Sequence, residues 1–287
     1  MQPFRIIVPI LFGGILASSA MAAEPKQIVS TSLCGDGYVL ALAEPSRIKT
    51  LSWQADGPLS LAPKDVRGKA GAWPEAESLL AQAPAKLVLG PGDKPAATQL
   101  AQSRGSQVHV LPWTDGFAGI EAAIQGLGEF LHETERAALV VLDMQNRLQH
   151  LAERKQRRNL DDALPLRVLY LTPTLGTAGA GTMVDAAIRA AGGQNLADDL
   201  GISGWGQIPI EQLVTHPPDL ILKSFFTDGP PSAVQFRSNH FVLRQISKKT
   251  PSLEIPGALW VCGGPYLIRA AEQIADQLDL MSKGEPS

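Results

Sequence analysis

The chain has 287 residues, 45% of them hydrophobic and 18% charged, with a formal net charge of −3. This length provides for a large core and, at ~150 residues per domain, predicts two lobes. The composition is ordinary for a soluble globular protein, and the slightly acidic balance argues against a nucleic-acid-binding surface.

Residues 1–22 are expected to be a secretory signal. Arg5 supplies the positive start, residues 6–17 the apolar run, and residues 20–22 the small-residue cleavage site. The apolar run is shorter than the ~20 residues that a membrane span needs. No cysteine follows the cleavage site, which argues against a lipid anchor. The sequence therefore predicts export to the periplasm in soluble form.

Helices alternate with short strands over residues 23–116, the predicted N-terminal lobe. The expected strands are residues 27–32, 48–52, 87–89 and 107–111, with a helix at 38–43 after the first strand. This order is typical of a parallel sheet with crossover helices.

The alternation stops over residues 117–160, which we interpret as an interlobe helical backbone. Residues 133–158 carry apolar side chains at helical spacing, and a helix of ~25 residues would be ~38 Å long. Its basic end, residues 154–158, is expected to be solvated and to complement the helix dipole.

The alternation resumes over residues 161–287, the predicted C-terminal lobe. We expect strands at 167–171, 220–222 and 258–261 and helices at 182–191 and 266–280. The predicted fold class is α/β, with two βα lobes that contain mostly parallel central sheets and are joined by one long interlobe helix.

One αβ unit occurs twice, at Glu77–Leu89 and at Glu211–Leu222. In both copies a proline follows the opening glutamate by seven residues, and three apolar residues at the end predict a buried strand. The copies are 134 residues apart, which suits two similar lobes better than a solenoid repeat.

Aromatic residues lie in loops or at the ends of predicted strands, where open α/β sheets bind ligands. Tryptophan at such positions favours a cleft for a flat or hydrophobic organic group, and a lysine at the same edge would suit an anionic ligand. The candidate ligand-binding residues are Trp53, Trp73, Trp113, Trp205, Lys223, Phe225 and Trp260.

Other site classes have little support in the sequence. The loop at residues 176–182 lacks the P-loop lysine and the third Rossmann glycine, and the five histidines show no metal-cluster spacing. No catalytic residue, metal site or intrinsic cofactor is therefore predicted. Two alternatives stay open: a carrier of bare Zn²⁺ or Mn²⁺ with ligands from separate loops, and an exported α/β enzyme acting at the same cleft.

Cys34 and Cys262 are the only cysteines. In an oxidising compartment they form a candidate disulfide that would join the two ends of the chain, with free thiols as the alternative.

The sequence resembles the helical-hinge periplasmic substrate-binding proteins of ABC importers, the family of vitamin B12, ferric-siderophore and haem carriers. The resemblance covers essentially the whole mature chain, and its most specific marks are Pro84–Leu89, Ala191–Leu196 and Glu211–Leu222. It implies a monomeric carrier that captures a metal chelate or large aromatic cofactor between its lobes. It also implies delivery to a permease dimer in the inner membrane.

The resemblance assigns roles to particular residues. It implies that Glu77 and Glu211 dock onto permease arginines, with Glu75 as a rival for the first position. Trp205 matches a cleft tryptophan of the vitamin B12 carriers, Trp53 stands where they have a cleft tyrosine, and Trp73 is two positions from another cleft tryptophan. Residues 90–91 and 262–265 depart from the vitamin B12 pattern, so the carrier role is clearer than a corrinoid ligand.

Overall fold

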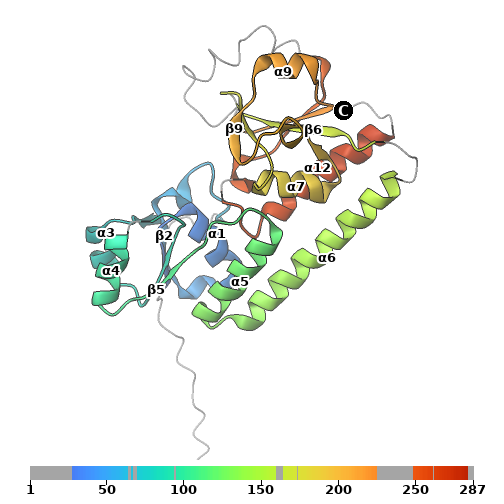
Figure 1. The fold of residues 1–287 in the computed structure, drawn as a ribbon. Coiled ribbons are helices and arrows are strands. Elements are labelled where there is room, and N and C mark those ends of the chain that lie inside the picture. Colours follow the sequence, from blue (N-terminus) through green and yellow to red (C-terminus); the bar gives the residue numbers. More distant parts are fainter. Residues whose placement is uncertain are drawn as a thin grey trace, which may run out of the picture.

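A computed structural model shows two lobes connected along one side by a long helix (Figure 1). It describes residues 28–63, 66, 70–93, 95–159, 164–172, 174–224, 248–260 and 262–283. The predicted signal sequence and Phe225 lie outside the described residues. Among those described, no helix is long and apolar enough to span a membrane.

The N-terminal lobe is built on a parallel sheet with the strand order β3-β2-β1-β4-β5. The central strands are fully buried, as expected for apolar strands covered on both faces. The strands are β1 (Ile28–Ser30), β2 (Ile48–Ser52), β3 (Ala70–Ala72), β4 (Lys86–Leu89) and β5 (Gln107–Val110). The helices are α1 (Leu33–Leu42), α3 (Ala76–Gln82) and α4 (Pro95–Ser103), with 3-10 turns η1 (Pro45–Arg47) and η2 (Trp53–Asp56).

The first helix begins earlier than the sequence suggested. Residues 33–37, expected as a loop, form the first turns of α1. The Ser32 hydroxyl caps the helix by accepting a hydrogen bond of 3.0 Å from the Gly35 amide.

The C-terminal lobe has a second parallel sheet with the order β11-β10-β6-β8, and β7 pairs with β9 in an antiparallel ribbon. The strands are β6 (Arg167–Leu171), β7 (Gly176–Ala178), β8 (Gln194–Asn195), β9 (Trp205–Gln207), β10 (Leu220–Lys223) and β11 (Ser252–Glu254). The helices are α7 (Met183–Ala191), α8 (Leu196–Asp199), α9 (Ile210–Thr215) and α12 (Leu267–Ser282). The predicted α/β fold class is thus confirmed.

The expected strand at residues 258–261 is wrong. The apolar run instead contains the 3-10 turn η3 (Gly257–Leu259), and β11 takes the sheet position beside β10. Leu259 and Trp260 are buried in this turn. A short apolar run signals burial but does not by itself distinguish a strand from another buried segment.

The interlobe backbone consists of two helices, α5 (Phe117–Leu131) and α6 (Thr134–Asn159). His132, in the left-handed region at φ 60°, ends α5 and turns the chain into α6. The 26 residues of α6 span ~39 Å along one side of both lobes (Figure 1).

The basic end of α6 is not simply solvated, contrary to expectation. Arg154 contacts Asp276 and Asp279 of α12 at 2.8 and 2.6 Å, and Arg158 also pairs with Asp279. Glu272 accepts from Arg147 at 2.7 Å. Positions 272, 276 and 279 lie on one face of α12 because they are four and three residues apart. These pairs attach α6 to the C-terminal lobe, while the ion pairs Arg47–Glu133 and Arg136–Glu44 hold the start of α6 on the N-terminal lobe.

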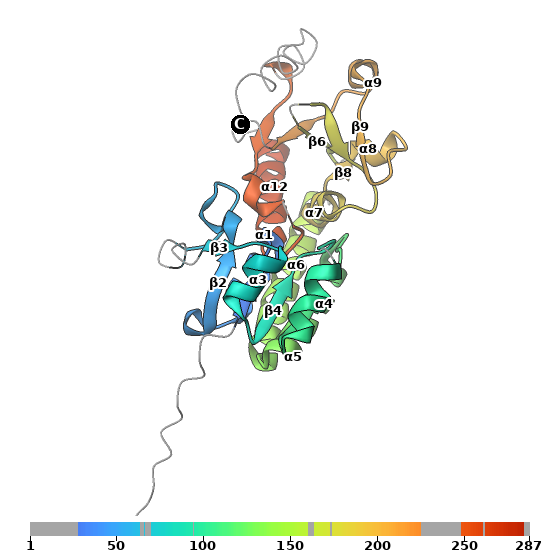
Figure 2. The same ribbon diagram turned by 90° about the vertical axis from the view of Figure 1, so that its left-hand side faces the viewer.

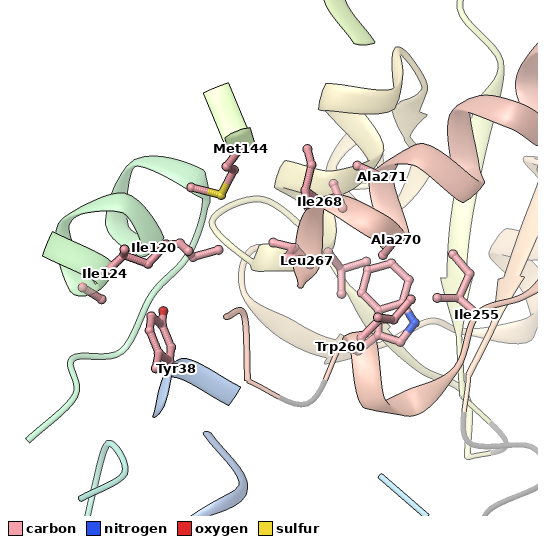
Figure 3. Close-up of a cluster of buried hydrophobic side chains, with 14 of the residues drawn as sticks. Tyr38, Ile120, Ile124, Met144, Ile255, Trp260, Leu267, Ile268, Ala270 and Ala271 are labelled. Atoms are coloured by element: carbon pink, nitrogen blue, oxygen red, sulfur yellow. The ribbon is translucent and has the colours of Figure 1, made fainter. Parts of the chain in front are cut away.

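One apolar cluster continues from one lobe to the other. Figure 3 shows Tyr38, Ile120 and Met144 on one side of it and Leu267, Ile268 and Trp260 on the other. Moving the lobes widely apart would expose this cluster to water. We therefore expect only small movements of one lobe relative to the other.

Candidate functional site

Three exposed tryptophans stand at the carboxyl edge of the N-terminal sheet. Trp53 directly follows β2, Trp73 directly follows β3, and Trp113 lies three residues after β5. Strands β2 and β5, which precede Trp53 and Trp113, are three strand spacings apart in the sheet, or ~14 Å. Trp113 is 78% exposed and the other two about half exposed. This edge therefore presents aromatic surface on both sides of the central strands.

Trp53 and Trp73 form a stacked pair. Their ring centroids are 4.4 Å apart and their planes differ by 3°. The pairing follows from the topology, because β2 and β3 are parallel neighbours that deliver their next residues to the same edge. The two rings thus form one joint platform, which the sequence did not predict.

Polar groups and a tight turn occupy the centre of this edge. Asp93 accepts hydrogen bonds from the Thr31 hydroxyl at 3.0 Å and the Gly90 amide at 2.8 Å. A Cβ atom at Gly90 would lie 2.5 Å from the Ser32 hydroxyl oxygen. An aromatic residue could not replace this glycine without moving Ser32, which accounts for the glycine at position 90.

The C-terminal lobe contributes Trp205 and Lys223. Trp205 lies on β9, not in a loop, and is about half exposed. Its ring makes an edge contact with the buried Tyr170, with centroids 6.0 Å apart. Lys223 is the last residue of β10 and is partly exposed at the carboxyl end of that strand.

Trp260 is not a ligand-contacting residue in this structure. It is 2% exposed and packs against Tyr170 with centroids 5.6 Å apart (Figure 3). The prediction for Trp260 is therefore wrong, because the turn that replaces the expected strand directs its ring into the core. The apolar neighbours at residues 258–261 were the available sign of burial.

The predicted disulfide is confirmed and lies where the lobes meet. Cys34 at the start of α1 is bonded to Cys262, with their Cα atoms 5.0 Å apart. The Gly263 carbonyl accepts from the Thr114 hydroxyl at 2.8 Å and from the Tyr38 hydroxyl at 3.4 Å. Burial raises the pKa of the Tyr38 phenol well above its ordinary value, so it stays protonated as a donor. Neither donor could be predicted from the sequence, because each acts across more than 140 residues of chain.

The buried carboxyl group of Asp36 has a structural role. It accepts hydrogen bonds from the Ser52 amide at 3.0 Å and the Ser52 hydroxyl at 2.6 Å. Burial raises the pKa of Asp36, an effect that these hydrogen bonds partly oppose. Asp36 thereby joins α1 to the end of β2 and positions the segment that begins with Trp53.

The described residues include no group of three or more His, Cys, Asp or Glu side chains placed to hold a metal ion. His109, for example, is on β5 and packs against Phe130, with ring centroids 5.3 Å apart. Its burial lowers the pKa of the imidazole.

Two exposed glutamates occupy equivalent places in the lobes. Glu77 is the second residue of α3, and Glu211 is the second residue of α9. Glu75 is also exposed but lies just before α3. Glu77, and not Glu75, therefore occupies the position in its lobe that corresponds to Glu211. Figure 1 shows α3 and α9 at the outer tips of the lobes, on the face opposite α6, and Figure 2 shows α3 from that side.

Comparison with known proteins extends these observations. A family model described as periplasmic binding protein matches residues 28–235. A cobalamin-binding protein of Halobacterium salinarum is 31% identical over 111 residues, which cover 38% of this chain and 29% of that protein. The match therefore spans under a third of this curated relative.

Solved structures share the fold along nearly the whole chain. A periplasmic heme binding protein from Pseudomonas aeruginosa aligns with a TM-score of 0.68 and 21% identity, covering 88% of this chain and 92% of that one. The periplasmic vitamin B12 binding protein BtuF of Vibrio cholerae aligns with a TM-score of 0.63 and 18% identity, covering 91% and 98%.

Proposed function

The chain belongs to the periplasmic binding protein family, and on this premise we propose that it is the solute-binding component of an ABC importer. It captures a metal chelate or large aromatic cofactor between its lobes and hands it to a permease dimer. It works as a soluble monomer in the periplasm after removal of residues 1–22. No bond in the ligand is broken, and the protein has no resident cofactor.

The observation that carries this proposal is the placement of exposed tryptophans on both lobes. The stacked Trp53–Trp73 pair and Trp113 line the N-terminal edge, and Trp205 is exposed on the other lobe. Exposed aromatic clusters are unusual on a monomeric protein without a binding role. Rings of this kind give a flat ligand a large apolar contact area at low conformational cost.

The ligand class follows from the same surfaces. Strands β2 and β5, which lead to Trp53 and Trp113, are ~14 Å apart, and an edge of this width suits a ligand much wider than a bare ion. Lys223 at the opposing edge suits an acidic substituent. Heme and cobalamin (vitamin B12), the ligands named for the three similar proteins described above, are large metal chelates and are the first to test.

Titration of the purified protein with hemin, cyanocobalamin and a ferric siderophore tests the proposal. Tryptophan fluorescence and native mass spectrometry should show one tight complex at 1:1 stoichiometry. Trp53→Ala and Trp205→Ala should each weaken that complex about tenfold, because each removes a desolvated aromatic contact. Leu139→Ala, at an exposed position of α6 outside the tryptophan-lined edges, is the matched control and should leave affinity unchanged.

The same samples separate the alternatives. Recovery of the ligand with unchanged mass after prolonged incubation supports a carrier, whereas a converted product would establish an enzyme. Metal analysis after dialysis against Zn²⁺ or Mn²⁺ without a chelator should find no stoichiometric ion. Tight binding of either bare ion would overturn the proposal.

Glu77 and Glu211 are proposed as the permease docking points. Both lie in the first turn of an exposed helix at a lobe tip, and acidic side chains there attract cationic partners. The double reversal Glu77→Lys/Glu211→Lys should abolish transport while ligand affinity stays unchanged. A loss of ligand affinity would contradict the docking assignment.

A further inference from the structure

The two helices that carry the proposed docking glutamates, α3 and α9, each expose an apolar side chain beside that glutamate. In α3 the adjacent leucines divide their roles: Leu79 enters the core of the lobe, whereas Leu80 is 41% exposed. In α9 Leu213 is likewise buried, and Val214 is 61% exposed. The lobes thus use one apolar residue of each pair for folding and leave the other at the surface.

The exposed apolar residue and the glutamate are neighbours on the helix surface. Leu80 is three residues after Glu77, and Val214 is three residues after Glu211. Residues at this spacing lie on one helix face with Cβ atoms ~5–6 Å apart. The two lobe tips therefore each present a carboxylate next to an apolar group.

A single exposed apolar residue is common and means little by itself. Here the arrangement occurs twice, at the same positions of two helices whose other residues differ, such as Ser78 and Gln212. Val214 also adds nothing evident to the fold, because an exposed β-branched residue is a moderately poor helix former. The repetition points to a shared external contact.

The surface beside Leu80 can receive a partner side chain. An open groove runs between the ends of α3 and α4, lined by Leu80, Pro84, Leu100 and Arg104 among others. Glu77 lies one helical turn from Leu80, so a partner group seated in the groove would bring a neighbouring cation close to the carboxylate.

Resting on the proposed function, we infer that each docking point is bipartite: Glu77 acts with Leu80, and Glu211 acts with Val214. The partner is the permease dimer, each subunit of which presents a cation next to an apolar contact. Helices α3 and α9 lie on the side of the molecule opposite α6 (Figure 1). Two similar docking points on one side suit a partner that presents the same surface twice. The carboxylates steer the encounter, and the apolar contacts slow dissociation.

The test measures binding of the ligand-loaded carrier to the importer's permease–ATPase complex in nanodiscs. Leu80→Ser and Val214→Ser should each weaken binding about fivefold, and the double variant about 25-fold, because the sites are distant and independent. Ligand affinity should not change. The salt dependence of the association rate should also stay as in the wild type, since both charges remain.

Leu139→Ser is the matched control, because Leu139 is 66% exposed on α6, away from the docking face. Equal weakening by Leu139→Ser and the docking variants would overturn the inference. So would an unchanged affinity of the Leu80→Ser/Val214→Ser double variant, or an effect at one tip only. Glu77→Gln/Glu211→Gln is measured in parallel and should lower both affinity and its salt dependence. If these charge variants also bind normally, the docking assignment itself is wrong. If only the Leu80→Ser/Val214→Ser variant binds normally, the apolar contribution is wrong and the assignment of the two glutamates stands.

Discussion

Removal of the interlobe disulfide should destabilise the protein mainly through its unfolded state. The bond joins residues 228 positions apart, so it closes almost the whole described chain into one loop. The loop-closure relation gives an entropy difference equivalent to about 5.5 kcal/mol at 25 °C for a loop of this length. Native disulfides usually contribute somewhat less, so we expect the Cys34→Ser/Cys262→Ser variant to lose about 3–5 kcal/mol of unfolding free energy.

The folded state should survive this change because other contacts hold the same junction. Gly263 still accepts hydrogen bonds from Tyr38 and Thr114, and Arg154 and Arg158 still bind α12. Circular dichroism and ligand affinity should therefore match those of the wild type. A lower stability with an unchanged folded state would locate the effect in the unfolded chain.

Urea unfolding provides the assay, with three samples measured side by side: oxidised wild type, reduced wild type and the double serine variant. The midpoint should fall by about 1–2 M in the last two samples, and their curves should coincide. Intact mass must rise by about two daltons on reduction, since each sulfur gains a hydrogen. A midpoint that stays unchanged after reduction is verified by mass would refute the loop-closure reasoning.

Trp260→Ala should cost about 3–5 kcal/mol in urea unfolding, because it empties a buried aromatic site. A change within 1 kcal/mol would contradict its place in the core. Burial raises the pKa of Asp279, but hydrogen bonds from Arg158 and Arg154 outweigh burial and hold the pKa below its ordinary value. The Asp279→Asn variant should therefore be about 1.5–3 kcal/mol less stable at pH 7. This difference should shrink as pH falls below about 4, since a lowered carboxyl pKa stabilises the fold only while the group is ionised; a pH-independent difference would be inconsistent with the pairing. Gly179→Ala should lower the melting temperature more than Gly181→Ala, because a Cβ atom at Gly179 would lie 1.7 Å from the Ile202 carbonyl oxygen. At Gly181, with φ 74°, alanine would carry only the strain of the left-handed backbone and meet no atom within 4 Å. Equal losses would argue against this close approach.

Local sequence patterns were sufficient for much of the fold. The predicted strands at 48–52 and 220–222 and the helix at 182–191 correspond to β2, β10 and α7 within two residues. These segments are bounded by prolines, glycines or charged residues and have a clear periodicity, so their local preferences agree with their final environment. The equivalent positions of Glu77 and Glu211 could likewise be predicted from the sequence, because each glutamate opens the same local pattern of apolar residues and proline.

The sequence by itself determined the alternation of strands and helices, the long α6 and the positions of Trp53 and Trp113 after strands. Only the tertiary structure decided that Trp53 stacks on Trp73, that Trp260 is buried and that Leu80 remains exposed. The physical reason is that periodicity reports which residues avoid water, and not what covers them. That choice depends on strand order and lobe packing, which bring together segments far apart in the chain, such as Arg154 with Asp279 and Cys34 with Cys262.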